Sequence, residues 1–180
     1  MKNYIESLYV HYPFCLSKCH YCGFYSTIYD KKIEYLYLNS LENELKYYFN
    51  EYDFSQLKTI YIGGGNPGLN SDFIVEINRI LYSIIDLNCI LEYTIECNPL
   101  NISENFLDNC KKNNINRISI GIQTFSDTSL NFANRTNQSR EVLDNAFNLL
   151  KEYNFNVSID LINGLPYSNI NKDLCFIKKF

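Results

Sequence analysis

Three cysteines near the start of the chain have a spacing that suits metal chemistry. Cys15, Cys19 and Cys22 follow a C-x3-C-x2-C pattern in the segment HYPFCLSKCHYCGFYS. Three ligands do not complete a tetrahedral structural zinc site, which needs four, although His11 or His20 could supply the fourth. We favour an iron–sulfur cluster held through three of its four irons, with one iron open for a substrate or cofactor. Zinc is the alternative.

The other four cysteines, Cys89, Cys97, Cys110 and Cys175, show no comparable spacing, and we expect them to be small hydrophobic side chains. The total of seven is odd, and the N-terminal segment MKNYIESLYV lacks the basic start and apolar core of a signal peptide. Both observations favour a reducing compartment, where clustered cysteines more often bind metal than form disulfides. We therefore expect a cytoplasmic protein.

Composition and charge exclude several classes of protein. A length of 180 residues suits one domain with a buried core. Hydrophobic residues make up 46% and charged residues 20%, which excludes a disordered chain, and no apolar run is long enough to span a membrane. Lys and Arg number 16 against 20 Asp and Glu, a net charge of −4, so we expect no nucleic-acid partner.

The elements that must position the cysteines alternate between strands and helices. Runs rich in β-branched and aromatic residues predict strands at 8–11, 59–62, 92–96, 117–122 and 157–162. Between the strands, apolar residues recur with the spacing of a helix, which predicts a first helix at 31–52 and a last one at 170–180. N-caps are expected at Ser71-Asp72, Ser103-Glu104 and Ser139. Five strand–helix repeats predict right-handed βαβ units and a parallel sheet, the α/β fold class.

Polar or small residues occupy every second position of the later strands. They are Thr94, Glu96 and Asn98, then Ser119, Gly121 and Gln123, then Ser158 and Asp160. Because a parallel sheet covered on both faces is apolar nearly throughout, this pattern indicates an open or partial barrel around a polar lumen. A flat sheet with one wet face is the alternative. Ligand sites of such folds lie at the carboxyl ends of the strands, where polar residues gather in this sequence.

Six motifs occur along the chain in a familiar order. They are YVHYPFC at 9–15, GGGNP at 63–67, EYTIECNP at 92–99, RISIGIQTF at 117–125, Arg135, and DLINGLP at 160–166. Together with the cysteine spacing they resemble the oxygen-independent coproporphyrinogen III oxidase-like (HemN/HemW) family of radical SAM proteins, over about residues 8–168. The resemblance implies a partial (β/α)6 radical SAM barrel of about five βα units. Residues 1–180 would form an incomplete core domain, without the sixth strand and the C-terminal domain.

The same resemblance implies roles for individual residues. Cys15, Cys19 and Cys22 would ligate a [4Fe–4S] cluster whose open iron is chelated by S-adenosylmethionine. One electron from a reducing donor would cleave that molecule to a 5′-deoxyadenosyl radical. The positions that match contacts to it are Tyr9, Tyr21, Gly64 and Glu96, and the remaining cofactor-binding positions are Gly65, Asn66, Gln123, Arg135 and Asp160.

These roles have physical reasons. The glycines that end the second strand would let the backbone approach a ligand, since they carry no Cβ. Glu96 could accept hydrogen bonds from an amino group or ribose hydroxyls, and a solvated strand-end carboxylate is the alternative. Arg135 could clamp a carboxylate at two points, or be an ordinary surface arginine. We expect Asp160 to be buried and therefore to need a partner or ligand.

Departures from the family pattern favour one of its branches. Phe24 stands where coproporphyrinogen oxidases carry a further cysteine, and the segment CHYCGF resembles the heme-chaperone branch. Asn66 replaces a threonine and Asn137 a common histidine. The resemblance thus predicts a heme chaperone, with heme or another porphyrin-type molecule as its partner. The alternatives are a radical SAM enzyme, either a coproporphyrinogen III dehydrogenase or a C-methyltransferase, and an inactive fragment.

Overall fold

The structure is a computed structural model that describes residues 2–135 and 138–178. Its strands are β1 (Ser7–Tyr12), β2 (Phe14–Cys15), β3 (Thr27–Ile28), β4 (Thr59–Gly64), β5 (Glu92–Cys97), β6 (Arg117–Gln123) and β7 (Asn156–Leu161). Its α-helices are α1 (Lys31–Glu51), α2 (Ser71–Tyr82), α3 (Glu104–Lys112), α4 (Asp127–Phe132), α5 (Arg140–Glu152) and α6 (Ile170–Ile177). Short 3-10 helices follow β4 at Pro67–Leu69 and β5 at Pro99–Asn101, and another lies at Leu87–Cys89.

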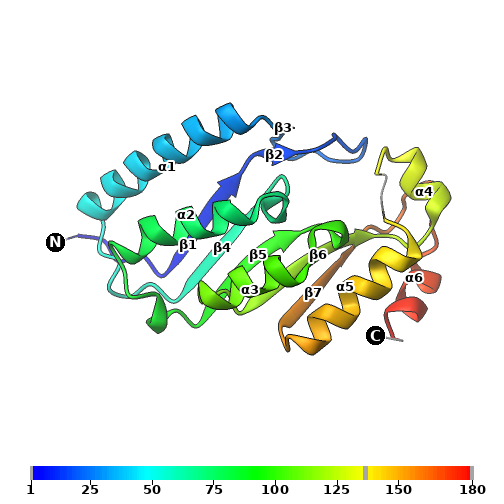
Figure 1. The fold of residues 1–180 in the computed structure, drawn as a ribbon. Helices are drawn as coiled ribbons and strands as arrows, with labels where there is room; N and C mark the ends of the chain where they lie inside the picture. The colour runs from blue at the N-terminus through cyan, green and yellow to red at the C-terminus, as the bar shows by residue number, and fades with distance from the viewer. Residues whose placement is uncertain (1, 136–137, 179–180) are drawn as a thin grey trace.

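Five strands form the main sheet in the order β1-β4-β5-β6-β7, and every neighbouring pair is parallel. These are the five predicted strands, with ends within two residues of the expected positions. Figure 1 shows α2, α3 and α5 side by side over one face of this sheet. The prediction of a parallel α/β sheet is therefore confirmed. Its carboxyl ends all meet at one rim, beside β2 and α4.

The two faces of the sheet differ in polarity, as the alternation predicts. The helix-covered face contributes fully buried isoleucines to the core, among them Ile60, Ile62, Ile95, Ile118 and Ile120. The other face carries the polar positions of β5, β6 and β7, of which Thr94 and Ser119 are buried. Hydrophobic burial thus fixes which face turns toward the helices. The polar face is left to line a cavity at the rim.

The N-caps that the sequence predicts for the helices agree with the structure, except at α2. The side chains of Ser103 and Ser139 cap α3 and α5 as predicted. The N-cap of α2 is Asn70, whose side chain accepts a hydrogen bond from the Asp72 N–H, and Ser71 is already helical. Asparagine caps a helix as well as serine does, so the sequence alone did not separate the two positions.

Three short elements at the rim had no recognisable signal in the sequence. Strands β2 and β3 form a two-residue parallel ladder that pairs Phe14 with Thr27 and Cys15 with Ile28. Helix α4 has six residues. Elements this short leave no periodicity to detect. Two predicted features lie outside the described residues: the end of the last helix at Phe180, and Asn137.

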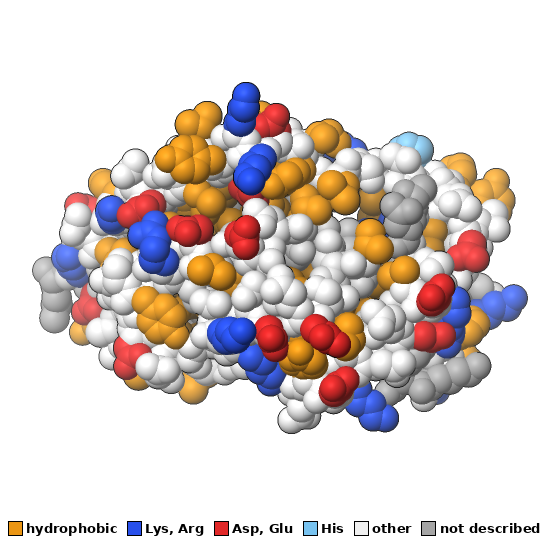
Figure 2. Space-filling model, viewed as in Figure 1, with side chains coloured by type: hydrophobic (Ala, Val, Ile, Leu, Met, Phe, Trp, Pro, Cys, Tyr) orange, Lys and Arg blue, Asp and Glu red, His pale blue; other side chains and the backbone are white. Residues whose placement is uncertain are grey.

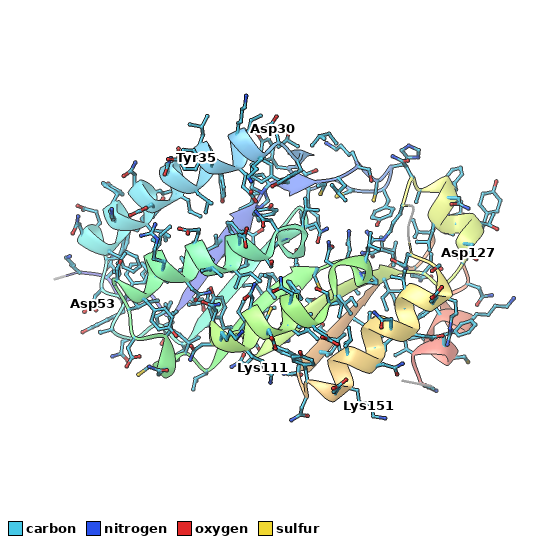
Figure 3. All side chains as sticks on the ribbon, in the orientation of Figure 1. Asp30, Tyr35, Asp53, Lys111, Asp127 and Lys151 are labelled. Carbon is cyan, nitrogen blue, oxygen red and sulfur yellow. The ribbon has the colours of Figure 1, made fainter. Side chains whose placement is uncertain are left out.

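The outer surface of α1 is unusually apolar. Figure 2 shows hydrophobic side chains gathered over this helix at the top of the view, and Ile33, Tyr35 and Leu36 are exposed. Tyr35 points away from the sheet in Figure 3. The described part of the chain contains no helix long and apolar enough to cross a membrane.

Candidate functional site

One cavity of about 530 Å³ opens at the rim where the strands end. All but one of the residues that the sequence marks as ligand or cofactor positions line it: Cys15, Cys19, Tyr21, Cys22, Gly64, Gly65, Asn66, Glu96, Gln123, Arg135 and Asp160. They come from separate parts of the chain. Parallel pairing brings them together, because it places all the strand ends on one side.

The cysteine loop, residues 15–28, lies across this rim and rests on the end of α4. The His20 backbone N–H donates to the Ala133 carbonyl at 3.0 Å, and the His20 Nδ1 lies 2.9 Å from the Phe132 carbonyl. The Asn134 side-chain amide donates to the Lys18 carbonyl at 3.0 Å. These contacts hold the outer side of the loop over the cavity.

The three thiols share one wall of the cavity. Each is half-buried. Burial raises the pKa of the Cys15 thiol, and the nearby charges of Cys22 and Cys19 raise it further. All three thiols line the same cavity. Soft thiolates grouped in this way are the ligands that iron–sulfur clusters use.

The structure gives His11 no unpaired ring nitrogen that could serve as a fourth ligand for zinc. Both ring nitrogens of His11 have partners, since Nδ1 lies 2.8 Å from the Tyr9 hydroxyl and Nε2 lies 3.0 Å from the Tyr25 carbonyl. Within residues 2–135 and 138–178, no three His, Cys, Asp or Glu side chains are arranged to hold a metal ion.

Glu96, at the end of β5, is held in a fixed orientation by its own neighbours. Its Oε1 accepts a hydrogen bond from the Tyr61 hydroxyl at 2.7 Å, and its Oε2 accepts one from the Gly64 N–H at 3.0 Å. Burial and this hydrogen bond raise the pKa of Tyr61, so the phenol stays a donor. A carboxylate has about four acceptor positions, so Glu96 can still accept hydrogen bonds from a ligand.

Arg135 connects the cysteine loop to the ends of two strands. Its Nη2 donates to Asn98 Oδ1 at 2.8 Å and to the Gly121 carbonyl. Its Nη1 donates to the Tyr21 hydroxyl at 3.2 Å, and its Nε donates to Gln138 Oε1 at 3.2 Å. Most of its donors are therefore used within the protein. Arg135 is neither a surface side chain nor a free clamp for a ligand carboxylate.

Asp160, at the end of β7, is exposed, so the prediction that it is buried was wrong. The reason is that β7 is an edge strand of the described sheet, flanked by β6 alone. Its Oδ2 accepts a hydrogen bond from Ser119 Oγ at 3.1 Å. On the neighbouring strand, Gln123 has a φ of 70° at the point where the pairing of β6 with β7 shifts register. Both side chains line the cavity.

Two other predicted residues have mainly structural contacts. Asn66 is buried, donates to Asn101 Oδ1 at 2.8 Å and accepts from the Asn98 N–H, so it joins β4 to the segment after β5. Tyr9 is the residue that does not line the cavity; its side chain is 55% exposed. Its ring stacks on that of Tyr61 at a centroid distance of 6.1 Å, and Tyr61 does line the cavity.

Glycine is required at positions 64 and 65 for a different reason from the one that we expected. Gly64 has a φ of 115°, and a Cβ there would lie 2.5 Å from the His11 ring and 3.0 Å from the Tyr12 carbonyl oxygen. A Cβ on Gly65 would lie 2.5 Å from the Phe14 carbonyl oxygen. The space beside both glycines is filled by β1 and β2. These glycines let the two chain segments pack closely, whereas we expected them to make room for a ligand.

Several lining residues were not predicted from the sequence, among them Tyr61, Asn98 and Gln138. Tyr61 shares one face of β4 with Thr59 and Gly63, so the period-two pattern used for the later strands could have identified it. Asn98 lies on the predicted polar face but was not singled out as a site residue. Gln138, which donates to the Ile122 carbonyl at 2.8 Å, follows no pattern in the sequence.

Comparison with known proteins agrees with this fold. A model of the radical SAM superfamily matches residues 9–174. The heme chaperone HemW of Lactococcus lactis is 34% identical over 178 residues, covering 97% of this chain and 45% of the relative. HemW of Bacillus subtilis is 36% identical over 168 residues, covering 90% and 43%. The chain therefore spans less than half the length of these curated relatives.

A solved structure extends the comparison. Coproporphyrinogen III oxidase (HemN) from Escherichia coli, described as a radical SAM enzyme, superposes with a TM-score of 0.84 at 29% identity, covering 99% of this chain and 41% of that one. The fold is thus a partial radical SAM barrel, as predicted. The chain belongs to the radical SAM superfamily. Membership in this family implies a [4Fe–4S] cluster and S-adenosylmethionine.

The packing of the glycines gives a first testable prediction. Changing Gly64 to Ala should destabilise the protein by about 1–3 kcal/mol, because the new Cβ meets the backbone of β1 in a left-handed conformation. Gly23→Ala, in the cysteine loop, is the matched control, since a Cβ there has no neighbour within 4 Å; its effect should stay within about 0.5 kcal/mol. Urea unfolding measures both. Equal stability of Gly64→Ala and wild type would contradict the packing explanation.

Proposed function

We propose that Cys15, Cys19 and Cys22 hold a [4Fe–4S] cluster at the rim and that S-adenosylmethionine binds in the adjoining cavity. The three half-buried thiols on one cavity wall support this assignment. When bound, the two cofactors supply one-electron cleavage of the sulfonium group, with the electron coming from an external reducing donor. The chain supplies the site, and we assign residues 1–180 to one radical SAM core domain.

The side chains around the cavity have distinct tasks in this proposal. Glu96 accepts hydrogen bonds from the ligand's amino group or ribose hydroxyls with its unused acceptor positions. Tyr21 is oriented by Arg135, and Tyr9 acts through the ring of Tyr61. The remaining cofactor contacts come from Gly64, Gly65, Asn66, Gln123 and Asp160, of which Asn66 and the glycines mainly shape the wall.

We further propose that the protein to which this core belongs is a heme chaperone. The observation that carries this is Phe24, which is 70% exposed, lines the cavity, and stands where the related oxidases carry a cysteine. Leu16 and Leu100, also exposed, line the cavity too. Exposed apolar side chains beside polar strand ends suit an amphipathic ligand such as heme, whose macrocycle is apolar and whose propionates are charged.

The place of action in this proposal is the cytoplasm. All seven cysteines are free thiols in the structure, which agrees with a reducing compartment. An enzyme acting on a porphyrinogen is the second candidate, and the similarity to coproporphyrinogen III oxidase from Escherichia coli favours it.

Cluster binding is the first prediction of this proposal. Anaerobic reconstitution with iron and sulfide should give a brown protein with about four irons per chain. Cys19→Ala should abolish the cluster, because two thiolates cannot replace three. Cys175→Ala removes an exposed thiol outside the cavity and should leave the iron content unchanged. Iron analysis and the visible spectrum decide; a colourless wild-type protein with one zinc would contradict the assignment.

Binding of S-adenosylmethionine gives the second prediction. Glu96→Ala should weaken the affinity about ten- to a hundredfold, because a hydrogen-bond acceptor for the ligand is lost. Glu92→Ala is the control: it removes a carboxylate from the same face of β5 at the end away from the rim, where Glu92 pairs with Arg117 at 3.5 Å. Calorimetric titration of the reconstituted protein gives both affinities. A wild-type affinity for Glu96→Ala would place the ligand elsewhere.

A heme-binding experiment distinguishes the chaperone from the enzyme. Titration with heme, followed by its Soret band, should show saturable binding, and Phe24→Asp should weaken it about tenfold, because a charge replaces an apolar contact. Phe132→Asp, at an exposed phenylalanine that does not line the cavity, is the control. Turnover of a porphyrinogen by the reconstituted protein, with no heme binding, would favour the oxidase alternative.

A further inference from the structure

One buried carboxylate, on Glu34, holds both ends of the cysteine loop. Glu34 is 3% exposed. Its Oε1 accepts a hydrogen bond from the Tyr12 hydroxyl at 2.5 Å, and its Oε2 accepts hydrogen bonds from the Tyr29 hydroxyl at 3.1 Å and from Asn70 Nδ2 at 2.8 Å. Tyr12 ends the strand before the loop, and Tyr29 directly follows it. A single side chain from α1 therefore joins the residues just before and just after the cysteine loop.

The surroundings of Glu34 offer its carboxyl group a helix N-terminus and three hydrogen-bond donors. It lies in the first turn of α1, which starts after Asp30 (labelled in Figure 3), and the positive end of the helix dipole favours an anion there. Three donors offset much of the desolvation cost of a buried carboxylate. Burial, followed by the hydrogen bond to Glu34, raises the pKa of Tyr12, so its phenol stays protonated as a donor.

Backbone contacts show that these two ends form a stem. Strands β2 and β3 pair with each other, the Thr27 N–H donates to the Pro13 carbonyl at 2.7 Å, and the Tyr29 N–H donates to the Cys15 carbonyl at 2.9 Å. The position of Cys15 thus depends directly on that of Tyr29. Asn70, the third partner of Glu34, is the N-cap of α2. The stem is therefore tied to two helices that pack on the sheet.

We propose that Glu34 is a positioning residue for the metal cluster. By binding the phenols of Tyr12 and Tyr29, it sets where the stem of the cysteine loop lies relative to the cavity. Glu34 does not line the cavity, so it acts through the loop. The role of the cysteines in this inference rests on the proposed function, whereas the anchoring of the loop can be tested on the protein without metal.

The first test measures how accessible the loop cysteines are in the metal-free, reduced protein. Iodoacetamide labelling is followed at each cysteine by mass spectrometry. In Glu34→Ala the labelling rates of Cys15, Cys19 and Cys22 should rise about tenfold, since three hydrogen bonds to a charged group are lost. The buried thiols Cys97 and Cys110 report global unfolding and should keep their wild-type rates. Glu34→Gln, which retains one acceptor oxygen, should give an intermediate rate.

A matched control comes from another buried carboxylate. Asp173, 3% exposed in the first turn of α6, accepts hydrogen bonds from the Thr124 hydroxyl and the Phe125 N–H, each at 2.9 Å. Asp173→Ala should lower the melting temperature without changing the labelling of the loop cysteines. Wild-type labelling rates in Glu34→Ala would overturn the proposal. So would equal increases at all cysteines in both variants, because the carboxylate would then serve overall stability alone.

The second test uses the reconstituted protein. The EPR spectrum of the reduced cluster, with and without S-adenosylmethionine, should change in Glu34→Ala and recover toward wild type in Glu34→Gln, whereas Asp173→Ala should leave it unchanged. An unaltered spectrum in Glu34→Ala would count against a positioning role. Failure of the wild-type protein to bind a cluster would refute the proposed function. The labelling result would still test whether Glu34 anchors the loop, because it is obtained on the metal-free protein.

Discussion

The parallel pairing of β1 with β4 is the contact on which the site depends. Its register sets His11 opposite Gly63 and Tyr12 opposite Gly64. The same pairing continues past the sheet, since the Gly65 N–H donates to the Tyr12 carbonyl at 2.7 Å. The cysteine loop begins where this contact ends, so it starts directly beside the glycine run. A side chain at position 64 would be strained by the φ of 115° and would meet the His11 ring and the Tyr12 carbonyl, so glycine lets the two segments pack closely where the loop begins.

Around this contact, polar side chains that could bind a ligand are first bound by the protein itself. Glu96 has two donors from β4, and Arg135 has acceptors on the cysteine loop, on β6 and on Asn98, directly after β5. Such bonds satisfy groups that would be costly to leave unpaired, and they fix each side chain before a ligand arrives. Glu96 retains acceptor capacity after these bonds, while Arg135 has few donors left. Within one cavity, therefore, one charged residue suits ligand binding and the other suits assembly of the loop.

The sequence predicted the sheet well because burial repeats along it. Alternating isoleucines on β6, for example, leave one register in which the apolar face meets the helices. Because the strands of such a sheet are parallel, it also predicted that the site residues at the strand ends lie together at one rim. It did not predict the solvent exposure of individual side chains or their hydrogen-bond partners. Asp160 is exposed because it lies on an edge strand. The donors of Arg135 are used because it contacts residues up to 114 positions away. Such features depend on tertiary neighbours, which composition and periodicity do not contain.

Glu34 illustrates this limit most clearly. In the sequence it is one acidic residue in the first turn of a helix, where a carboxylate needs no further explanation. Only the fold shows that two tyrosines separated by the whole cysteine loop meet on its two oxygens. A loop whose ends are fixed in this way has fewer conformations to lose when it binds a metal cluster. In our proposal, the affinity and geometry of the metal site would thus depend on a residue that lies outside the cysteine motif.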